Sequence, residues 1–328
     1  MNYRFGSIAI LLVVAGLAAD LAAAQSYATR PIRMLVPYPP GAATDTSARM
    51  LAARLSEGLG QQVITDNRTG ASGMIATALL ARAAPDGHTL MVVDVAHAAN
   101  PALNDKMAYD TLKDFSAVSL VLRVPMFLLV NPAFPAQSVK ELIAVARANP
   151  GKYNYGSAGT GSTMYLIAEL FKAQAGVDLV HVAYKGGAPA LADVMGGQIP
   201  MCFLSTVASL PQVKAGRVRA LGISGRSRSP VAPEVQTIAE SGVPGFEFYL
   251  WQAMIVPAGT PQPIMARLNS EVIAALNHAA SKELLGNLGA EPTPTTPQQA
   301  DAYIRAEVDR WKKTLASSAV PPKSALGK

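Results

Sequence analysis

Short apolar runs alternate with amphipathic segments in the first hundred residues. The apolar runs are residues 32–36, 63–65 and 89–93, and the segments between them, 46–59 and 73–83, repeat apolar side chains every three or four residues. Runs of the first kind predict buried strands, and segments of the second kind predict helices. Strands that alternate with helices favour a parallel sheet covered on both faces, which binds ligands at the carboxyl ends of its strands.

A second α/β unit follows the first. It begins with an apolar run at 126–130, continues through a predicted helix at 139–148 and returns as a strand at 180–182. The chain of 328 residues also exceeds the size at which one hydrophobic core usually stops growing. We therefore expect an α/β protein of two lobes.

Two extended segments are expected to cross between the lobes. They are residues 118–130 and 246–256, and a double crossing of this kind makes a hinge. The expected first lobe consists of residues 25–124 and 248–328, and the expected second lobe of residues 125–247.

Two glycine-rich turns lie where a predicted strand meets a predicted helix. The first spans residues 37–45 and the second spans 155–162, where Ser162 is placed to cap the following helix. Free N–H groups and the macrodipole make a helix N-terminus attractive to an anion, and glycine lets the anion come close. One turn from each lobe therefore predicts a clamp on a single anionic ligand.

The N-terminus has the pattern of a secretory signal peptide. Arg4 precedes an apolar run at 8–19, and the small residues Ala22, Ala23 and Ala24 suit signal peptidase. A retained membrane anchor is the alternative, but this run is short for the roughly 20 residues that span a bilayer. We expect residues 1–24 to be removed after Ala24 and the mature protein to work in the periplasm.

Composition and motifs argue against several other classes of protein. The net charge is +6, but the basic residues are scattered and do not alternate with aromatic residues, so nucleic-acid binding is not expected. The sequence contains no metal-ligand spacing, nucleophile elbow or P-loop, and Gly159-Thr160-Gly161 lacks the third glycine of a dinucleotide fingerprint. The single cysteine, Cys202, cannot form an intramolecular disulfide. We expect neither an enzyme nor a bound cofactor or metal.

Several segments together carry a resemblance that covers nearly the whole mature chain. They are residues 30–45, Asp66-Asn67-Arg68-Thr69-Gly70-Ala71-Ser72-Gly73, Pro85-Asp86-Gly87-His88-Thr89-Leu90, residues 109–115, Tyr155-Gly156-Ser157-Ala158-Gly159, Tyr184-Lys185-Gly186-Gly187-Ala188-Pro189-Ala190 and Pro257-Ala258-Gly259-Thr260-Pro261. In this order they resemble the Bug family, the periplasmic solute-binding receptors of tripartite tricarboxylate transporters.

The resemblance implies a monomeric "Venus flytrap" of the type II periplasmic-binding-protein fold. Such a receptor closes over a small carboxylate and delivers it to the permease subunits of the transporter. A receptor that reports its closed form to a signalling protein is the alternative, and the sequence does not separate the two roles. Neither turn contains a lysine or arginine, so the carboxylate would depend on N–H groups, hydroxyl groups and bridging water.

The two turns supply most of the candidate ligand-binding residues. In lobe 1 these are Tyr38, Pro40, Gly41, Ala42, Ala43, Thr44, Asp45 and, near the next helix, Ser72; in lobe 2 they are Ser157, Ala158, Gly159, Thr160, Gly161 and Ser162. Asp45 is expected to fix the first turn by accepting backbone N–H bonds, with a water-holding role as the alternative. The absence of a basic cluster disfavours citrate.

The specificity of the site is expected from side chains outside the turns, and each of these has a structural alternative. Asp94 would disfavour an anionic substituent and favour a hydrogen-bond donor or cation, unless it pairs locally with a backbone N–H or with His97. Tyr165 and Trp251 either face the cleft or pack internally. The remaining candidates are His97, which with Asp94 follows the predicted strand at 89–93, Tyr184, Lys185 as a distal positive charge, and Thr206, which either reaches the ligand or caps a helix.

Overall fold

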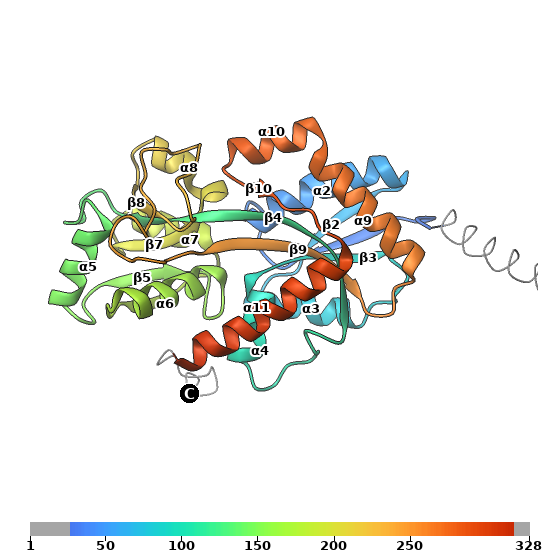
Figure 1. Ribbon diagram of the computed structural model, residues 1–328, viewed down its shortest axis with the longest axis horizontal. Coiled ribbons are helices and arrows are strands. Elements are labelled where there is room, and N and C mark those ends of the chain that lie inside the picture. Colours follow the sequence, from blue (N-terminus) through green and yellow to red (C-terminus); the bar gives the residue numbers. More distant parts are fainter. Residues whose placement is uncertain (1–26, 318–328) are drawn as a thin grey trace, which may run out of the picture.

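The computed structural model describes residues 27–317, so the expected signal peptide at 1–24 lies outside the described residues. Two lobes lie side by side (Figure 1), and the longest strands, β4 (Phe115–Val130) and β9 (Tyr249–Pro257), run between them. Both segments that were expected to cross the hinge therefore form strands, and they pair with each other in antiparallel fashion.

Lobe 1 is built on the three strands predicted for the first unit, β1 (Ile32–Val36), β2 (Val63–Asn67) and β3 (Thr89–Asp94). β1 pairs in parallel with both β2 and β3. The helices of this lobe are α2 (Ala43–Leu59), α3 (Met74–Ala81) after a 3-10 turn (Ala71–Gly73), α4 (Val95–Leu103), α9 (Gln262–Asn277), α10 (Ala279–Asn287) and α11 (Pro297–Ser317), with a short strand β10 (Glu291–Pro292).

Lobe 2 repeats the arrangement with β5 (Asn154–Ser157) between β6 (Val180–Ala183) and β7 (Met201–Ser205), all parallel. Its other elements are α5 (Val139–Ala148), α6 (Thr163–Ala175), α7 (Gly187–Met195), α8 (Thr206–Lys214) and β8 (Arg219–Ile223). Within residues 27–317 one continuous path of strands, β2-β1-β3-β9-β4-β7-β5-β6, joins the lobes. The sheet is mixed rather than parallel because the crossing strands run against their neighbours.

The helix boundaries differ from the predicted ones where a turn is special. α2 begins at Ala43 instead of residue 46, so the last three residues of the first turn are already helical. α3 begins at Met74 instead of residue 73 because Gly73 has a φ of 85°, a left-handed conformation that a helix does not contain. Ala71 and Ser72 before it are also left-handed, with φ values of 48° and 53°. α4, which directly follows β3, was not predicted.

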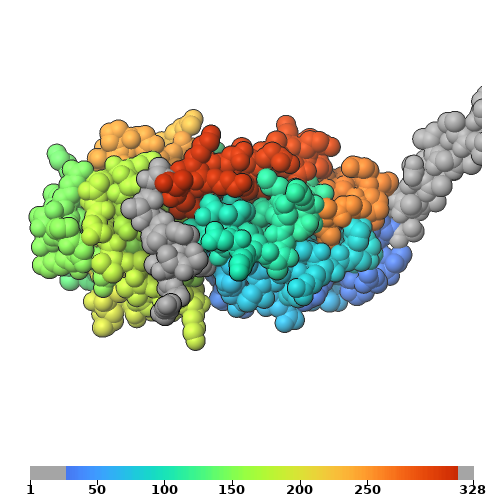
Figure 2. Space-filling model, turned by 90° about the horizontal axis from the view of Figure 1, so that it is seen from below, coloured from blue at the N-terminus to red at the C-terminus, as the bar shows by residue number. Residues whose placement is uncertain are grey.

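The C-terminal helix α11 lies over the junction of the two lobes (Figure 2, red). It packs against α4 and β4. Its Trp311 is 1% exposed and meets the ring of Phe248 edge to face, with the centroids 6.1 Å apart. This helix therefore fastens lobe 1 to the segment that enters the second crossing strand.

Cys202 lies in the middle of β7, opposite Leu129 of β4. Its side chain is fully buried, and burial raises the pKa of its thiol to about 12. The thiol is therefore protonated and shielded from reagents.

In residues 27–317 we find no helix that combines the length and the apolar character needed to cross a membrane.

Candidate ligand-binding site

A cavity of about 260 Å³ lies between the lobes, among the first turn, the crossing strands and the helix starts of lobe 2. Its lining residues are Tyr38, Pro39, Pro40, Gly41, Ala42, Ala43, Thr44 and Asp94 from lobe 1, Met126 and Leu250 from the crossing strands, and Ala158, Ser162, Thr163, Met164, Lys185, Gly186, Gly187, Ala188, Pro189, Leu191, Leu204, Ser205 and Ala208 from lobe 2.

Five helices begin at this cavity. The residues immediately before α2, α4, α6, α7 and α8 are Ala42, Asp94, Ser162, Gly186 and Ser205, and all five line the cavity. Asp94 and Ser162 cap their own helices through side-chain hydrogen bonds, to the N–H groups of residues 96 and 165. Since α2, α7 and α8 have no side-chain cap, their first N–H groups remain for a ligand or water.

The uncapped starts of α2 and α7 come from different lobes and meet each other. A Cβ atom added to Gly186 would lie 3.7 Å from Cγ of Pro39 in the first turn. Gly186 has a φ of 143°, a conformation that other residues rarely adopt. The two positive helix ends therefore face one volume, where a single anionic group can interact with both.

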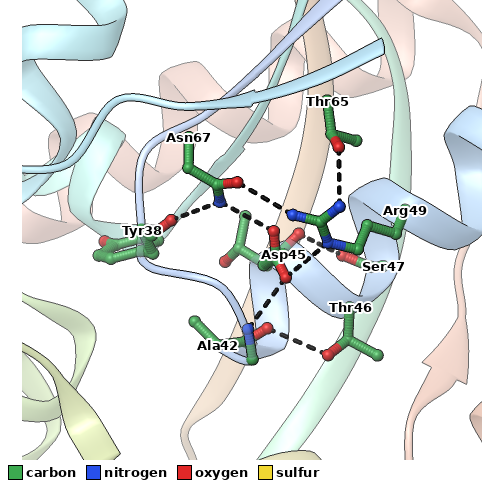
Figure 3. Close-up of polar contacts among 10 residues, drawn as sticks. Tyr38, Ala42, Asp45, Thr46, Ser47, Arg49, Thr65 and Asn67 are labelled. Atoms are coloured by element: carbon green, nitrogen blue, oxygen red, sulfur yellow. Dashed lines mark hydrogen bonds and ion pairs between the residues drawn. The ribbon is translucent and has the colours of Figure 1, made fainter. Parts of the chain in front are cut away.

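The first turn is held by Asp45 (Figure 3). Its Oδ2 accepts hydrogen bonds from the N–H of Gly41 at 3.0 Å and from Nε of Arg49 at 2.9 Å, and its Oδ1 accepts from Asn67 Nδ2 at 2.8 Å. Asn67 Nδ2 also donates to the carbonyl of Tyr38 at 2.8 Å. Burial raises the pKa of Asp45, but the three hydrogen bonds and the positive charge of Arg49 outweigh it and hold this pKa below its usual value. Asp45 thus fixes the turn, as expected, from a position outside the cavity.

Asp94 joins the two lobes at the cavity wall. Its Oδ1 accepts from the hydroxyl of Tyr38 at 3.0 Å and from the N–H of Ala96 at 3.0 Å, and its Oδ2 accepts from Oγ1 of Thr163 in lobe 2 at 3.1 Å. Burial raises the pKa of Asp94 to about 6, although these three donors oppose the rise. The local pairing considered from the sequence is present as the bond to Ala96.

A second hydrogen bond joins the lobes at the strained segment before α3. Oγ of Ser72 donates to the carbonyl of Thr160 in the second turn at 2.7 Å. Gly161 in the second turn also lies close to lobe 1, since a Cβ atom added to it would lie 3.0 Å from Cδ1 of Leu103. Together with the Thr163–Asp94 bond, these contacts mean that the structure has its lobes closed.

The structure brings ten of the predicted site residues to the cavity and places the others around it. Those in the lining are Tyr38, Pro40, Gly41, Ala42, Ala43, Thr44, Asp94, Ala158, Ser162 and Lys185. Ser72, Thr160 and Gly161 form the contact between the lobes. Ser157 and Gly159 hold the second turn together, because the N–H of Gly159 donates to Ser157 Oγ at 3.0 Å.

The other aromatic candidates, apart from Tyr38, and Thr206 lie outside the lining and make internal contacts. His97 packs against the rings of Tyr109 and Phe115, which also contact each other, and Tyr165 meets His181 edge to face. Trp251 donates a hydrogen bond from Nε1 to Glu307 at 2.8 Å, and the hydroxyl of Tyr184 donates one to Asp193 at 2.8 Å. Thr206 is fully buried in the first turn of α8. The packing alternative considered for Tyr165 and Trp251 is therefore the one that their neighbours favour.

Sequence reasoning missed the part of the cavity formed by α7 and the wall behind it. Thr163, Gly186 and Gly187 were not selected, nor were the apolar side chains of the wall. Two glycines followed by Pro189 carried a usable signal, since proline favours the first turn of a helix.

The geometry agrees with comparisons to known proteins. Residues 47–319 match the model of the tripartite tricarboxylate transporter family receptor. The periplasmic binding protein BugD is 32% identical, with a TM-score of 0.84 over 88% of this chain and 98% of that one. The chain belongs to the Bug family of these receptors. Bug-family relatives of this kind are solute-binding proteins with the two-lobed fold expected from the sequence.

Two further similar structures contain carboxylates. An R. palustris protein solved with adipate is 39% identical, with a TM-score of 0.84 over 88% of this chain and 97% of that one. MatC from Rhodopseudomonas palustris, solved with bound malate, is 34% identical, with a TM-score of 0.83 over 88% of this chain and 100% of that one.

In this Bug-family receptor, Asp94 and His97 are expected to give opposite pH dependences of stability. Burial lowers the pKa of His97 to about 4 from 6.5, and it raises that of Asp94 from 3.8 to about 6. The stability due to Asp94 is complete below pH 3.8 and is lost as the pH rises through 6. The stability due to His97 is complete above pH 6.5 and is lost as the pH falls through 4. The two contributions therefore oppose each other across the same range.

Asp94→Asn should remove the contribution of Asp94 to the pH dependence of stability and leave that of His97. The free energy of unfolding of the wild type, minus that of the variant, should fall by about 2 kcal/mol as the pH rises from 4 to 6.5. Urea unfolding followed by circular dichroism over this pH range measures the difference. A difference that does not change with pH would contradict the raised pKa.

Proposed function

We propose that the protein is exported to the periplasm, closes on a small carboxylate-bearing molecule and delivers it to the permease of a tripartite tricarboxylate-type transporter. The observation that carries the proposal is the meeting of the uncapped starts of α2 and α7, one from each lobe, at the cavity between the lobes. A carboxylate there interacts with both lobes at once, so it favours the closed state over the open one. The adipate and malate in two relatives are consistent with this chemistry.

The proposal includes how the mature protein is organised. It is a monomer that begins after Ala24, with lobe 1 made of residues 25–124 and 248–328 and lobe 2 of residues 125–247. The permease recognises the closed arrangement, in which Ser72 and Thr163 hold the lobes together.

A thermal-unfolding screen tests the proposed ligand chemistry. Mature protein, refolded to strip bound ligand, is mixed with mono-, di- and tricarboxylates, aromatic acids and the matched uncharged amides. An acid present at 100 times its dissociation constant should add roughly 2.7 kcal/mol of stability, and its amide should add much less. If folded protein responds to no acid, or equally to acid and amide, the carboxylate clamp is wrong.

Ser72→Gly should raise the free energy of unfolding of the receptor but lower its affinity for the acid. Glycine relieves the left-handed strain at this position, roughly 1–2 kcal/mol, while the bond to Thr160 that closes the lobes is lost. One such bond contributes about 0.5–1.5 kcal/mol, which corresponds to an affinity loss of up to about tenfold. Isothermal titration calorimetry with the acid that gives the largest thermal shift measures the loss.

Ala71→Gly is the matched control for Ser72→Gly. Ala71 has the same left-handed conformation, with a φ of 48°, but its side chain has no hydroxyl to donate across the cleft. It should therefore gain stability without losing affinity. Equal affinities for the two variants would remove Ser72 from the closure mechanism.

A further inference from the structure

The charged side chains of the cavity are few and of opposite sign. Among the lining residues, Lys185 is the one cation and Asp94 is the one anion. Lys185 is exposed and directly precedes the start of α7, where the uncapped helix end already attracts an anion. A single carboxylate at this position interacts with Lys185 and with the starts of α2 and α7. It therefore uses all the positive groups on that side of the cavity.

The wall next to this position is apolar. It consists of Met126, Met164, Leu191, Leu204, Ala208 and Leu250, contributed by six different elements. The wall begins directly beside α7, since a Cβ atom added to Gly187 would lie 2.8 Å from Cδ1 of Leu204 and 3.4 Å from Sδ of Met164. A ligand held by its carboxylate at α7 therefore places the atoms that follow against hydrocarbon and thioether groups, which favour an apolar body.

A second carboxylate finds little compensation in the rest of the cavity. The hydroxyl groups of Tyr38 and Thr163 each have one hydrogen, and both donate it to Asp94. Ser205 and the uncapped start of α8 offer hydrogen-bond donors and the positive end of a helix, but among the described lining residues no lysine or arginine lies beside them, in contrast to the start of α7 with Lys185. Asp94, when ionised, repels a second negative charge in this poorly hydrated space.

We propose that the cavity takes a monocarboxylic acid with an apolar body, aliphatic or aromatic, and discriminates against acids with a second carboxylate. The proposal rests on the proposed function, because it assigns the ligand class of the same cavity. It separates this chain from the two relatives solved with dicarboxylates, adipate and malate.

Matched pairs of acids test the proposal. Isothermal titration calorimetry on ligand-stripped protein compares hexanoate with adipate, and benzoate with terephthalate, so that each pair differs by one carboxylate on the same framework. Hexanoate and benzoate should each bind at least roughly tenfold more tightly than their diacids. A diacid that binds as tightly as its partner, or more tightly, overturns the assigned class and leaves the carboxylate receptor intact. If no acid binds better than its amide, the proposed function fails and the ligand class with it.

Two variants link the selectivity to the residues that carry it. Asp94→Asn removes the negative charge and should reduce the ratio of the adipate to the hexanoate dissociation constant by at least about fivefold. Met164→Gln keeps the length of the side chain but makes the wall polar, and it should weaken hexanoate binding by about fivefold or more. Met50→Gln, at a half-buried position of α2 outside the cavity, is the control and should leave hexanoate binding unchanged. An unchanged acid ratio in Asp94→Asn, or unchanged hexanoate binding in Met164→Gln, would contradict the proposal.

Discussion

Gly187→Val is expected to weaken the binding of hexanoate by at least about 100-fold, or roughly 2.7 kcal/mol. The first atom of the new side chain would lie 2.8 Å from Cδ1 of Leu204 and 3.4 Å from Sδ of Met164, both in the cavity lining. The isopropyl group therefore fills the space where the carboxylate meets α7 and the apolar wall begins. Calorimetric titration with hexanoate measures the loss.

The chain offers a close control for this substitution. Gly286, in α10, is also a helical glycine outside the left-handed region, and a Cβ atom added there would meet nothing within 4 Å. Gly286→Val should bind hexanoate like the wild type, although both variants carry the general penalty of valine in a helix. If Gly187→Val also binds normally, the ligand does not lie at the start of α7.

Trp311→Ala is expected to lower the free energy of unfolding by about 3–5 kcal/mol, because it removes a fully buried indole from α11 and leaves a cavity. Urea unfolding followed by circular dichroism measures the change, which should lower the midpoint and leave the slope unchanged.

Replacement of each tryptophan by phenylalanine gives a sharper comparison. Nε1 of Trp311 is buried without a hydrogen-bond partner, whereas Nε1 of Trp251 donates to Glu307. Trp311→Phe deletes an unsatisfied donor and should be the milder variant, whereas Trp251→Phe leaves a buried carboxylate oxygen with one donor fewer. The reverse order would mean that Nε1 of Trp311 has a partner, such as an ordered water.

The sequence predicted most of the strands, though not β8 or β10, and several of the helices, because the apolar periodicity reports burial directly. Residues 32–36 and 139–148 have the predicted boundaries, since the first is an apolar run interrupted only by the exposed Arg33 and the second is capped by Ser138. α4 escaped prediction because it follows β3 without a loop, and Pro101 within it argues against a helix.

The site could be predicted only where chain neighbours create it. The first turn and its fixing residue Asp45 lie within one local segment, so both were found. Thr163 was missed because its role depends on Asp94, which reaches it only when the lobes close. Trp251 is buried, and the sequence of a strand buried on both faces does not indicate which face an aromatic side chain takes.

Because Cys202 is shielded inside the sheet, cysteines introduced at the molecular surface can be labelled selectively. The chain has no other native cysteine, so a pair of cysteines placed on opposite sides of the cleft would react with a maleimide dye while the buried Cys202 would not. A donor and an acceptor fluorophore attached there would report opening and closing of single molecules in real time. The native cysteine need not be removed first, so the reporter would retain the wild-type core.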